Sequence, residues 1–318
     1  MNVKRLNNHK NLSDMGNKCR NLAQLTELGF NVPQAYGLTF SAFAKFIEPL
    51  VSEIESIIQM NGCKTGSRMI RKLIVNSSIP KTVRQDIEGL TNYFSSETKL
   101  AVRSSGMVIE NGEALMEDAN NKSLAGQYES FLNVSNGSIL NAVKLCWASL
   151  FNERSLHVFN AKNNDTFLES KMSVVVQEMI LADASAVMMT QDPLEKEPML
   201  AMETTYGPCE AIVSGKVTGD LITIDRKSMQ VCSKIMGSKK SYIYYSPFNI
   251  MNNGNYQLIQ NSDEMRSQFA VDDEIALRIA RVGLEIEKKF GSPQDIELVV
   301  NNGKIFVVQT RNITTSIH

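Results

Sequence analysis

The strand pair QDIELVVNNGKIFVVQTR, near the end of the chain, constrains the fold more than any other stretch. Two runs rich in β-branched residues flank Asn-Asn-Gly, a combination typical of a β-hairpin. A three-residue loop with Gly303 at positive φ predicts that Val300 pairs with Lys304. In this register Asp295 lies opposite Gln309. The pattern therefore predicts a mostly apolar hairpin that carries polar residues away from its turn.

Four polar side chains are expected to share one face of this hairpin, because side chains alternate along a strand. They all lie at odd positions: Asp295, Glu297, Gln309 and Arg311. The apolar residues lie at even positions: Ile296, Leu298, Val300, Phe306 and Val308. Burying carboxylates beside a guanidinium is costly unless something binds there. Two carboxylates and an amide oxygen suit Mg²⁺, and an arginine suits phosphate, whereas the alternative is a structural salt bridge.

The bulk composition excludes several classes of function. The 318 residues are 43% hydrophobic and 21% charged, as in an ordinary globular protein. A net charge of −1 gives no electrostatic basis for binding nucleic acid or an anionic membrane. No apolar run approaches the roughly 20 residues of a membrane-spanning helix, and no secretory signal is visible. Five scattered cysteines without a C-x-x-C pair argue against a zinc site or a disulfide framework, so a reduced, cytoplasmic location is expected.

Helical patterns dominate the first hundred residues, and strands dominate the second half. Helices are predicted over residues 18–28, 41–59 and 70–94, the last interrupted at Pro80. A helix over residues 139–159 follows, and its Trp147 and Phe151 are expected in the core.

The strands begin where the helices of the first part end. Residues 99–103 are predicted as a strand that runs into a turn at Ser104-Ser105-Gly106, and residues 107–122 as an exposed loop. From Lys171 onward short strands prevail, until Asp272 or Asp273 caps a last long helix that Gly291 ends. This order predicts an α+β architecture of two lobes with a helical N-terminal part.

Three short motifs in the first half could bind phosphate. Gly16-Asn17-Lys18 opens a helix, where backbone N–H groups and a cation can hold an anion, although a solvated surface lysine is the alternative. Arg103 lies with two serines where a strand is expected to enter a turn, and the alternative is a structural arginine paired with a carboxylate. The small, flexible turn at residues 123–127 could cover a triphosphate as a lid.

Two motifs in the second half are weaker. Glu210 follows a strand in YGPCE and could accept hydrogen bonds from ribose hydroxyls, although an exposed acidic turn is the alternative. Lys239 and Lys240 in MGSKK form a basic turn, for which a solvated charge pair is the usual explanation.

Together, these motifs and their order resemble the nucleotide-binding domain of the phosphoenolpyruvate synthase and pyruvate phosphate dikinase family, which includes rifampicin phosphotransferase and glutamine kinase. The resemblance runs from about Ser13 to Thr314 and is densest in AVRSS, SLAGQYESFLNV, ASLFNER, YGPCEAIVSG, MGSKK and the final DIE and QTR. It implies a single ATP-grasp domain at residues 1–318, in which two α+β lobes clamp ATP. Lobe one is expected at about residues 1–180 and lobe two at about 181–318.

The resemblance also implies a role for each matching residue in holding the triphosphate of ATP. Lys18 and Arg103 are implied as phosphate ligands, and Arg311 as the residue on the transferring phosphates. Glu297 and Gln309 are implied as Mg²⁺ ligands. Such chemistry depends mostly on positioning and charge neutralisation, so cations and metals matter more than a general base.

The remaining implied contacts surround the nucleoside and the metal. Gln177 and Met179 lie on the strand that meets adenine through its backbone, Glu210 on the ribose, and Asp295 beside the metal as a supporting carboxylate. The lid is implied to contribute Ser123, Gly126 and Gln127.

The chain departs from the family pattern at several points. Pro208 and Cys209 replace the Leu and Gly of the usual Gly-Leu-Gly-Glu, which puts the contact at Glu210 in doubt. Asn17 replaces the second glycine of the usual Gly-Gly-Lys, and the segment between Arg103 and the lid is longer than is common. The phosphohistidine and acceptor-substrate domains of the family are not found, and no histidine lies in a Thr-Ser-His-like context.

Three functions are therefore considered. The first is a module that cleaves Mg·ATP and passes the β-phosphoryl group to a histidine on a separate domain or chain, giving AMP and phosphate, for onward phosphorylation of a small molecule. The second is a self-contained ATP-grasp kinase or ligase that acts on a small acceptor and gives ADP. The third is a nucleotide sensor without turnover. The sequence names neither the final acceptor nor the oligomeric state.

Overall fold

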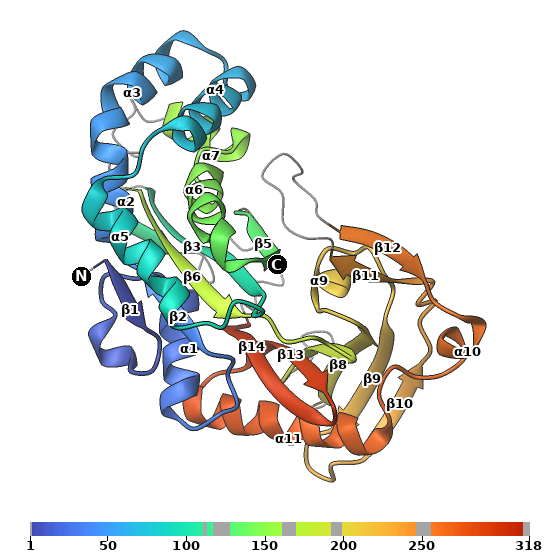
Figure 1. Cartoon of the computed structure of the whole chain (residues 1–318). Coiled ribbons are helices and arrows are strands. Elements are labelled where there is room, and N and C mark those ends of the chain that lie inside the picture. Colours follow the sequence, from blue (N-terminus) through green and yellow to red (C-terminus); the bar gives the residue numbers. More distant parts are fainter. Residues whose placement is uncertain are drawn as a thin grey trace. The chain divides into compact units, whose positions relative to one another are not determined.

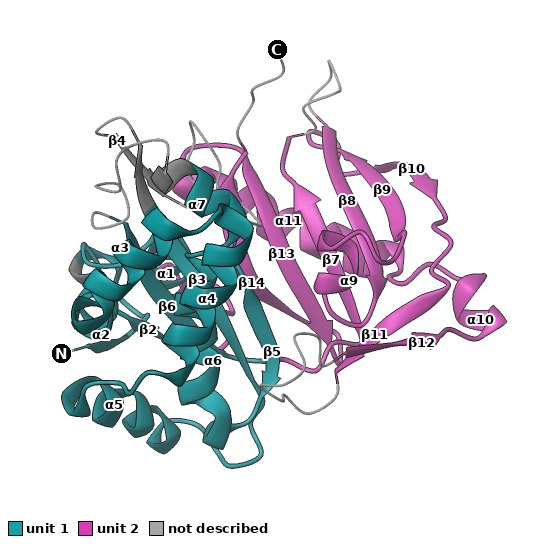
Figure 2. Ribbon diagram, turned by 90° about the horizontal axis from the view of Figure 1, so that it is seen from above, with its two compact units in different colours: residues 1–24, 34–179, 247–255 teal, residues 25–33, 180–246, 256–318 magenta. Residues whose placement is uncertain are grey.

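Two antiparallel sheets, each with its own helices, organise the structure. The computed structural model describes residues 2–110, 113–116, 128–160, 170–191, 199–245 and 256–313 (Figure 1). Unit 1 comprises Met1–Gln24, Gln34–Met179 and Pro247–Asn255, and unit 2 comprises Leu25–Pro33, Ile180–Ser246 and Tyr256–His318 (Figure 2). The segment Leu25–Pro33 therefore belongs to unit 2, although it lies early in the sequence.

Unit 1 contains a sheet in the order β1-β2-β6-β3-β4, with β5 also paired to β3. Its strands are β1 (Val3–Arg5), β2 (Ala35–Leu38), β3 (Leu100–Glu110), β4 (Glu113–Met116), β5 (Ser130–Val134) and β6 (Lys171–Glu178). Its helices are α1 (Asn17–Glu27, whose last residues fall in unit 2), α2 (Phe40–Ile47), α3 (Val51–Met60), α4 (Cys63–Asn76), α5 (Lys81–Glu88), α6 (Ile139–Ser149) and α7 (Glu153–Asn160).

The core of unit 1 lies between one face of this sheet and the helices that cover it. Val102 of β3 and Val176 of β6 contribute to it from the sheet. Trp147 of α6 stacks on Phe46 of α2 with ring centroids 4.8 Å apart, and Phe151 is fully buried. The prediction that Trp147 and Phe151 are core residues is therefore confirmed.

Two helices expected from the sequence are each interrupted. The predicted helix over residues 41–59 is split by a 3₁₀ turn at Glu48–Leu50, because Pro49 lacks an N–H and disfavours helical geometry before it. The predicted helix over residues 139–159 ends at Ser149. Asn152 then caps the start of α7, since its Oδ1 accepts a hydrogen bond from the Ser155 N–H at 2.9 Å.

The predicted turn after Arg103 is absent from the described structure of β3. Leu100–Met107 pairs continuously with β6, and β3 continues to Glu110. Gly106 was expected to help form the turn. Its lack of a side chain instead lets the ring of Tyr128 pack closely against β3, because a Cβ there would lie 2.6 Å from Cε2 of Tyr128. The expected loop at residues 107–122 was wrong in its first part, where β3 pairs with β4.

Unit 2 contains a sheet in the order β10-β9-β8-β7-β13-β14 and a separate pair, β11-β12. Its strands are β7 (Ala184–Met189), β8 (Met199–Tyr206), β9 (Asp220–Asp225), β10 (Val231–Ile235), β11 (Ser241–Tyr245), β12 (Tyr256–Gln260), β13 (Gln294–Asn301) and β14 (Lys304–Asn312). Its helices are α9 (Glu210–Val213), α10 (Asp263–Arg266) and α11 (Asp273–Phe290).

Helix α11 covers the apolar face of the larger sheet of unit 2. Asp272 caps it by accepting a hydrogen bond from the Ile275 N–H at 2.7 Å, and Gly291 ends it in the left-handed conformation with φ 75°. Its Ile279 packs in one cluster with Ile296 and Leu298 of β13. The predicted capped helix is therefore confirmed.

The α+β class expected from the sequence is confirmed, because in each unit helices and an antiparallel sheet share one core. Within the described part of the chain, none of the helices has the length and apolar character to cross a membrane.

Candidate functional site

The hairpin of β13 and β14 has a tighter turn than the sequence suggested. Asn301 pairs with Lys304, so the loop has two residues, Asn302 and Gly303. Their φ values of 49° and 69° both lie in the left-handed region, as a type I′ turn requires. The predicted three-residue loop, with Val300 opposite Lys304, was therefore wrong.

A β-bulge corrects the register farther from this turn. The pairing shifts by one residue between Glu297 and Leu298, because Leu298 pairs with Val307 but Glu297 pairs with Gln309. Without the bulge, Gln309 would lie opposite Ile296 on the apolar face. With it, all four predicted polar residues share one face, although Asp295 lies opposite Arg311 and not opposite Gln309.

The bulge also changes which apolar residues of β14 reach the core. Val307 is buried beside Leu298 in the cluster under α11. Val299 lies two residues from Glu297 on β13, so both face the same side of the hairpin. Phe306 pairs with Val299 and therefore lies on the polar face. The expectation that Phe306 and Val308 share the apolar face with Ile296 was wrong for Phe306, and Val307 reaches the core cluster in place of Val308.

Asp295 and Arg311 form the salt bridge that the sequence offered as an alternative. Nε and Nη2 of Arg311 donate to Oδ2 of Asp295 at 2.8 and 2.6 Å. The side chain of Asp295 is 12% exposed and that of Arg311 is 34% exposed. The ion pair therefore holds the guanidinium in place while part of it stays open to solvent or to an anion.

Gln309 and Glu297 form the second polar pair of this face. Gln309 is 8% exposed, and its Oε1 accepts no hydrogen bond from the described chain. Glu297 lies directly opposite on β13 and is half-buried. A buried amide oxygen next to a carboxylate supplies two oxygen donors of the kind that Mg²⁺ prefers. Among the described residues, no group of three or more His, Cys, Asp and Glu side chains is arranged to hold a metal, so other ligands would have to come from the nucleotide or from water.

In unit 1, the start of α1 is fastened to the sheet by two serines. The Gly16 N–H donates to Oγ of Ser173 at 3.0 Å, and the Lys18 N–H donates to Oγ of Ser105 at 3.2 Å. Both N–H groups already have hydroxyl partners, which disfavours binding of a phosphate by the backbone of Gly16 and Lys18. Lys18 is buried and not a solvated surface lysine, so any contribution to an anion comes from its side chain.

Arg103 and Gln177 share the sheet face to which α1 is fastened. Ala101, Arg103 and Ser105 face the same side of β3, because they are two residues apart. On β6, Gln177 pairs with Ala101 and Val175 pairs with Arg103, so Gln177 faces this side too. Lys18, Arg103 and Gln177 are thus gathered on one side of the unit 1 sheet. Gln177 is 1% exposed, and its Nε2 has no hydrogen-bond partner in the described chain.

Met179 follows β6 directly, and its backbone N–H is already engaged. It donates to the carbonyl of Lys99 at 2.8 Å, and the Met179 sulfur lies 3.2 Å from the Asn133 backbone nitrogen. An adenine at this strand end would therefore need a different N–H or the side chain of Gln177. The predicted lid residues Ser123, Gly126 and Gln127 lie outside the described residues.

Burial strongly changes one titratable group beside Lys18. Cys19 is fully buried, and desolvation raises the pKa of its thiol to about 12, although a hydrogen bond with Ser173 and the charge of Lys18 act in the opposite direction. The thiol is therefore neutral at physiological pH and serves as a packing group.

Glu210 is the first residue of the four-residue helix α9 in unit 2. Nζ of Lys216 lies 3.6 Å from Oε1 of Glu210. The same ammonium group lies 4.3 Å from the ring centroid of Tyr256. Gly207 enters the turn before α9 with φ 76°, a conformation that favours glycine. The Glu210 side chain is 37% exposed and is held near a cation.

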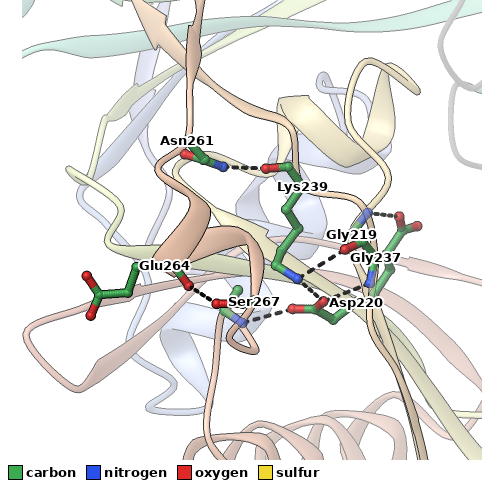
Figure 3. A network of polar contacts seen from close by, with 9 residues as sticks. Gly219, Asp220, Gly237, Lys239, Asn261, Glu264 and Ser267 are labelled. Atoms are coloured by element: carbon green, nitrogen blue, oxygen red, sulfur yellow. Dashed lines mark hydrogen bonds and ion pairs between the residues drawn. The ribbon is translucent and has the colours of Figure 1, made fainter.

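The sequence did not reveal a buried ion pair at the other end of the β8–β9 connection (Figure 3). Lys239 and Asp220 are both fully buried, and Nζ of Lys239 contacts Oδ1 of Asp220. Asp220 also accepts hydrogen bonds from the N–H groups of Gly237 at 2.9 Å and Ala270 at 2.8 Å. The solvated charge pair expected for MGSKK was therefore wrong for Lys239.

Known proteins are similar to nearly the whole chain. The model of the family described as pyruvate phosphate dikinase, AMP/ATP-binding domain, matches residues 12–318. Rifampicin phosphotransferase of Bacillus subtilis is 32% identical, and the match covers 96% of this chain and 34% of that protein. A probable phosphoenolpyruvate synthase of Methanothermobacter thermautotrophicus is 30% identical over 94% of this chain and 44% of its own length.

A solved structure, the D-alanine–D-alanine ligase of Bacillus anthracis, matches 94% of this chain and 56% of that one, with 8% identity and a TM-score of 0.32, too low to carry an argument. The family match has a different weight, because it covers almost every residue from the start of α1 to the final hairpin. The chain spans well under half the length of these two curated relatives. The protein belongs to the pyruvate phosphate dikinase, AMP/ATP-binding domain family.

Proposed function

We propose that this chain is the ATP-grasp nucleotide-binding module of a dikinase-type phosphotransferase. It cleaves Mg·ATP and passes the β-phosphoryl group to a histidine on a separate domain or chain, which then phosphorylates a small molecule. Water takes up the γ-phosphoryl group, so that AMP and phosphate are the other products. The observation that carries the proposal is the family match over residues 12–318, and the unsatisfied Oε1 of buried Gln309 opposite Glu297 is compatible with a bound cation.

The proposal assigns the triphosphate to cationic side chains and the metal. Glu297 and Gln309 hold Mg²⁺, which neutralises charge on the phosphate oxygens. Lys18, Arg103 and Arg311 bind phosphates. Asp295 supports the site by fixing the guanidinium of Arg311 through two hydrogen bonds to Oδ2.

The nucleoside contacts complete the proposal. Gln177 and the chain near Met179 contact adenine, and the unpartnered Nε2 of Gln177 supports a direct contact from this side chain. Glu210 accepts hydrogen bonds from the ribose. Ser123, Gly126 and Gln127 form the lid over the phosphates.

The need for a partner rests on the comparisons. Rifampicin phosphotransferase and the probable phosphoenolpyruvate synthase are much longer than this chain, which matches 34% and 44% of them. We therefore assign the histidine and the small-molecule acceptor to a separate domain or subunit.

Identification of the nucleotide product tests this function. The chain is incubated with Mg·ATP, alone and with a histidine-bearing domain of a relative or a candidate small acceptor, and the products are separated by anion-exchange chromatography. AMP that depends on the histidine-bearing domain supports the proposal. ADP that depends on a small acceptor would identify a self-contained kinase or ligase, and binding without either product would identify a nucleotide sensor.

A further inference from the structure

Helix α9 is too short to fix its own position. Its four residues, Glu210–Val213, form about one turn, and isolated helices of this length are unstable. Its orientation must therefore come from contacts with the rest of unit 2. This matters because Glu210, which begins the helix, is the proposed ribose ligand.

Apolar packing holds one side of α9. Ala211 is fully buried and forms a small cluster with Val217 and with Ile243 of β11. This cluster fixes the body of the helix but makes no directional contact at its first residue. A second anchor is needed to set where the Glu210 side chain begins.

The thiol of Cys209 supplies that second anchor. Cys209 immediately precedes Glu210 and is buried. Its Sγ donates to the carbonyl of Leu298 at 3.2 Å and lies 3.8 Å from the carbonyl of Ala186. Leu298 and Ala186 are paired across β13 and β7, so the thiol sits against two strands of the sheet.

This anchor ties α9 to the strand that carries the polar face. Leu298 directly follows Glu297 in β13, and the bulge that aligns Glu297 with Gln309 lies between these two residues. A contact with the Leu298 carbonyl therefore sets the place of Glu210 relative to Glu297.

We propose that Cys209 is a positioning residue whose thiol, by holding the start of α9 on β13, places Glu210 where it reads the 2′-hydroxyl of the ribose of ATP. The inference rests on the proposed function, in which Glu210 contacts the ribose. Lys216 complements the anchor, since its ammonium group lies between the Glu210 carboxylate and the ring of Tyr256.

The test compares the dissociation constants of Mg·ATP and Mg·2′-deoxy-ATP by calorimetry. We expect the wild-type chain to bind ATP about tenfold more tightly, as for one hydrogen bond to a charged group. Cys209→Ala should reduce this ratio to about twofold or less, because the donor is lost. Cys209→Ser should keep the ratio, because the hydroxyl still donates, and Cys232→Ala is the matched control because Cys232 is exposed.

Combination with Glu210→Ala separates positioning from a general loss of structure. Glu210→Ala alone should bring the ratio close to one, and adding Cys209→Ala should change it no further. A folded Cys209→Ala chain with the wild-type ratio would overturn the inference. Equal wild-type affinity for the two nucleotides would also overturn it and leave the Mg·ATP module intact, whereas no binding of Mg·ATP would remove the proposed function itself.

A second measurement applies if Cys209→Ala does not fold. In a chain with Cys63→Ala and Cys232→Ala, the rate of iodoacetamide modification at Cys209 is followed by peptide mass spectrometry. Mg·ATP should slow the modification more than saturating Mg·2′-deoxy-ATP does, because the ribose contact draws α9 onto the sheet. Equal protection by both nucleotides would contradict the role of Cys209.

Discussion

Gln309 is a residue whose burial costs stability in the free protein and serves the proposed function. Its buried Oε1 accepts no hydrogen bond in the described chain, and leaving such a group unsatisfied costs about 1–3 kcal/mol. A bound cation would remove that cost. The side chain is thus better suited to the liganded protein than to the free one.

Replacing Gln309 should separate stability from binding. Gln309→Met keeps the length of the side chain and removes the unpaired acceptor, so we expect the free energy of unfolding to rise by about 1 kcal/mol. The affinity for Mg·ATP should fall by at least about tenfold, because a metal ligand is lost. Urea unfolding and calorimetry measure the two effects.

Thr204→Val is the matched control for this variant. Thr204 is fully buried, its Oγ1 also has no hydrogen-bond partner in the described chain, and it pairs with Ala186, a core residue. The control should gain similar stability and keep its affinity for Mg·ATP. A Gln309→Met chain that is less stable, or that binds Mg·ATP as tightly as wild type, would contradict the metal assignment.

Lys239 and Asp220 should contribute strongly to the stability of unit 2. Lys239→Met leaves a fully buried carboxylate without its cation, and we expect a loss of about 3–5 kcal/mol in the free energy of unfolding. The exposed pair between Arg84 and Glu88 is the control, since Arg84→Met should cost at most about 1 kcal/mol. Equal losses in denaturant unfolding would show that the buried pair has no special weight.

At the scale of single residues, the sequence predicted which polar side chains share a face better than it predicted which side chains are buried. The shared face of Asp295, Glu297, Gln309 and Arg311 follows from strand alternation and was found. The burial of Lys239 was missed, because a basic turn between strands has no periodicity that reveals which side chain points inward. Its left-handed backbone, with φ 34°, depends on contacts that only the folded chain supplies.

Among the elements, α1 is the one whose placement most affects the proposed phosphate contacts. A Cβ on Gly16 would lie 2.3 Å from Oγ of Ser105, which receives the Lys18 N–H. The helix can therefore approach the sheet this closely only because residue 16 is glycine.

Gly16→Ala should push the start of α1 away from β3. We expect a loss of about 1–3 kcal/mol in unfolding free energy, as for other overpacked sites, and weaker binding of Mg·ATP because Lys18 moves with the helix. Gly137→Ala is the control, since nothing lies within 4 Å of a Cβ there. Unchanged affinity in a folded Gly16→Ala chain would exclude Lys18 from the phosphate site.

The sequence predicted the existence of elements better than their limits. The cap at Asp272 and the stop at Gly291 are local signals, and α11 was correctly bounded. The breaks at Pro49 and Asn152 were passed over because the apolar spacing continues across them. The long course of β3 was missed because Ser-Ser-Gly resembles a turn, although pairing with β6 holds it extended.

At the scale of the molecule, the division into units does not follow chain order. Leu25 at the end of α1 is fully buried in the core of unit 2. Two hydrogen bonds join Asn31 to β14: its carbonyl accepts the Val307 N–H at 2.9 Å, and its Nδ2 donates to the Ile305 carbonyl at 2.9 Å. No local pattern in the sequence indicates this assignment, because the partners lie more than 270 residues away.

Leu25→Ala should therefore destabilise unit 2 more than unit 1. We expect a cost of about 2–5 kcal/mol, as for other large-to-small core replacements. Hydrogen exchange should show a greater loss of protection in β13 and β14 than in β3 and β6. Leu38→Ala, which truncates a fully buried residue of unit 1, should give the opposite distribution, and the same distribution in both variants would contradict the division.

The length of the turn and the bulge of the final hairpin together decide which face Gln309 occupies. A two-residue loop alone would move Gln309 to the apolar face, and the one-residue bulge restores it. Val308 is the residue that the bulge adds to β14, and Leu298 and Glu297 already pair with the residues on either side of it. Deletion of Val308 would therefore remove the bulge while Gln309 stays opposite Glu297.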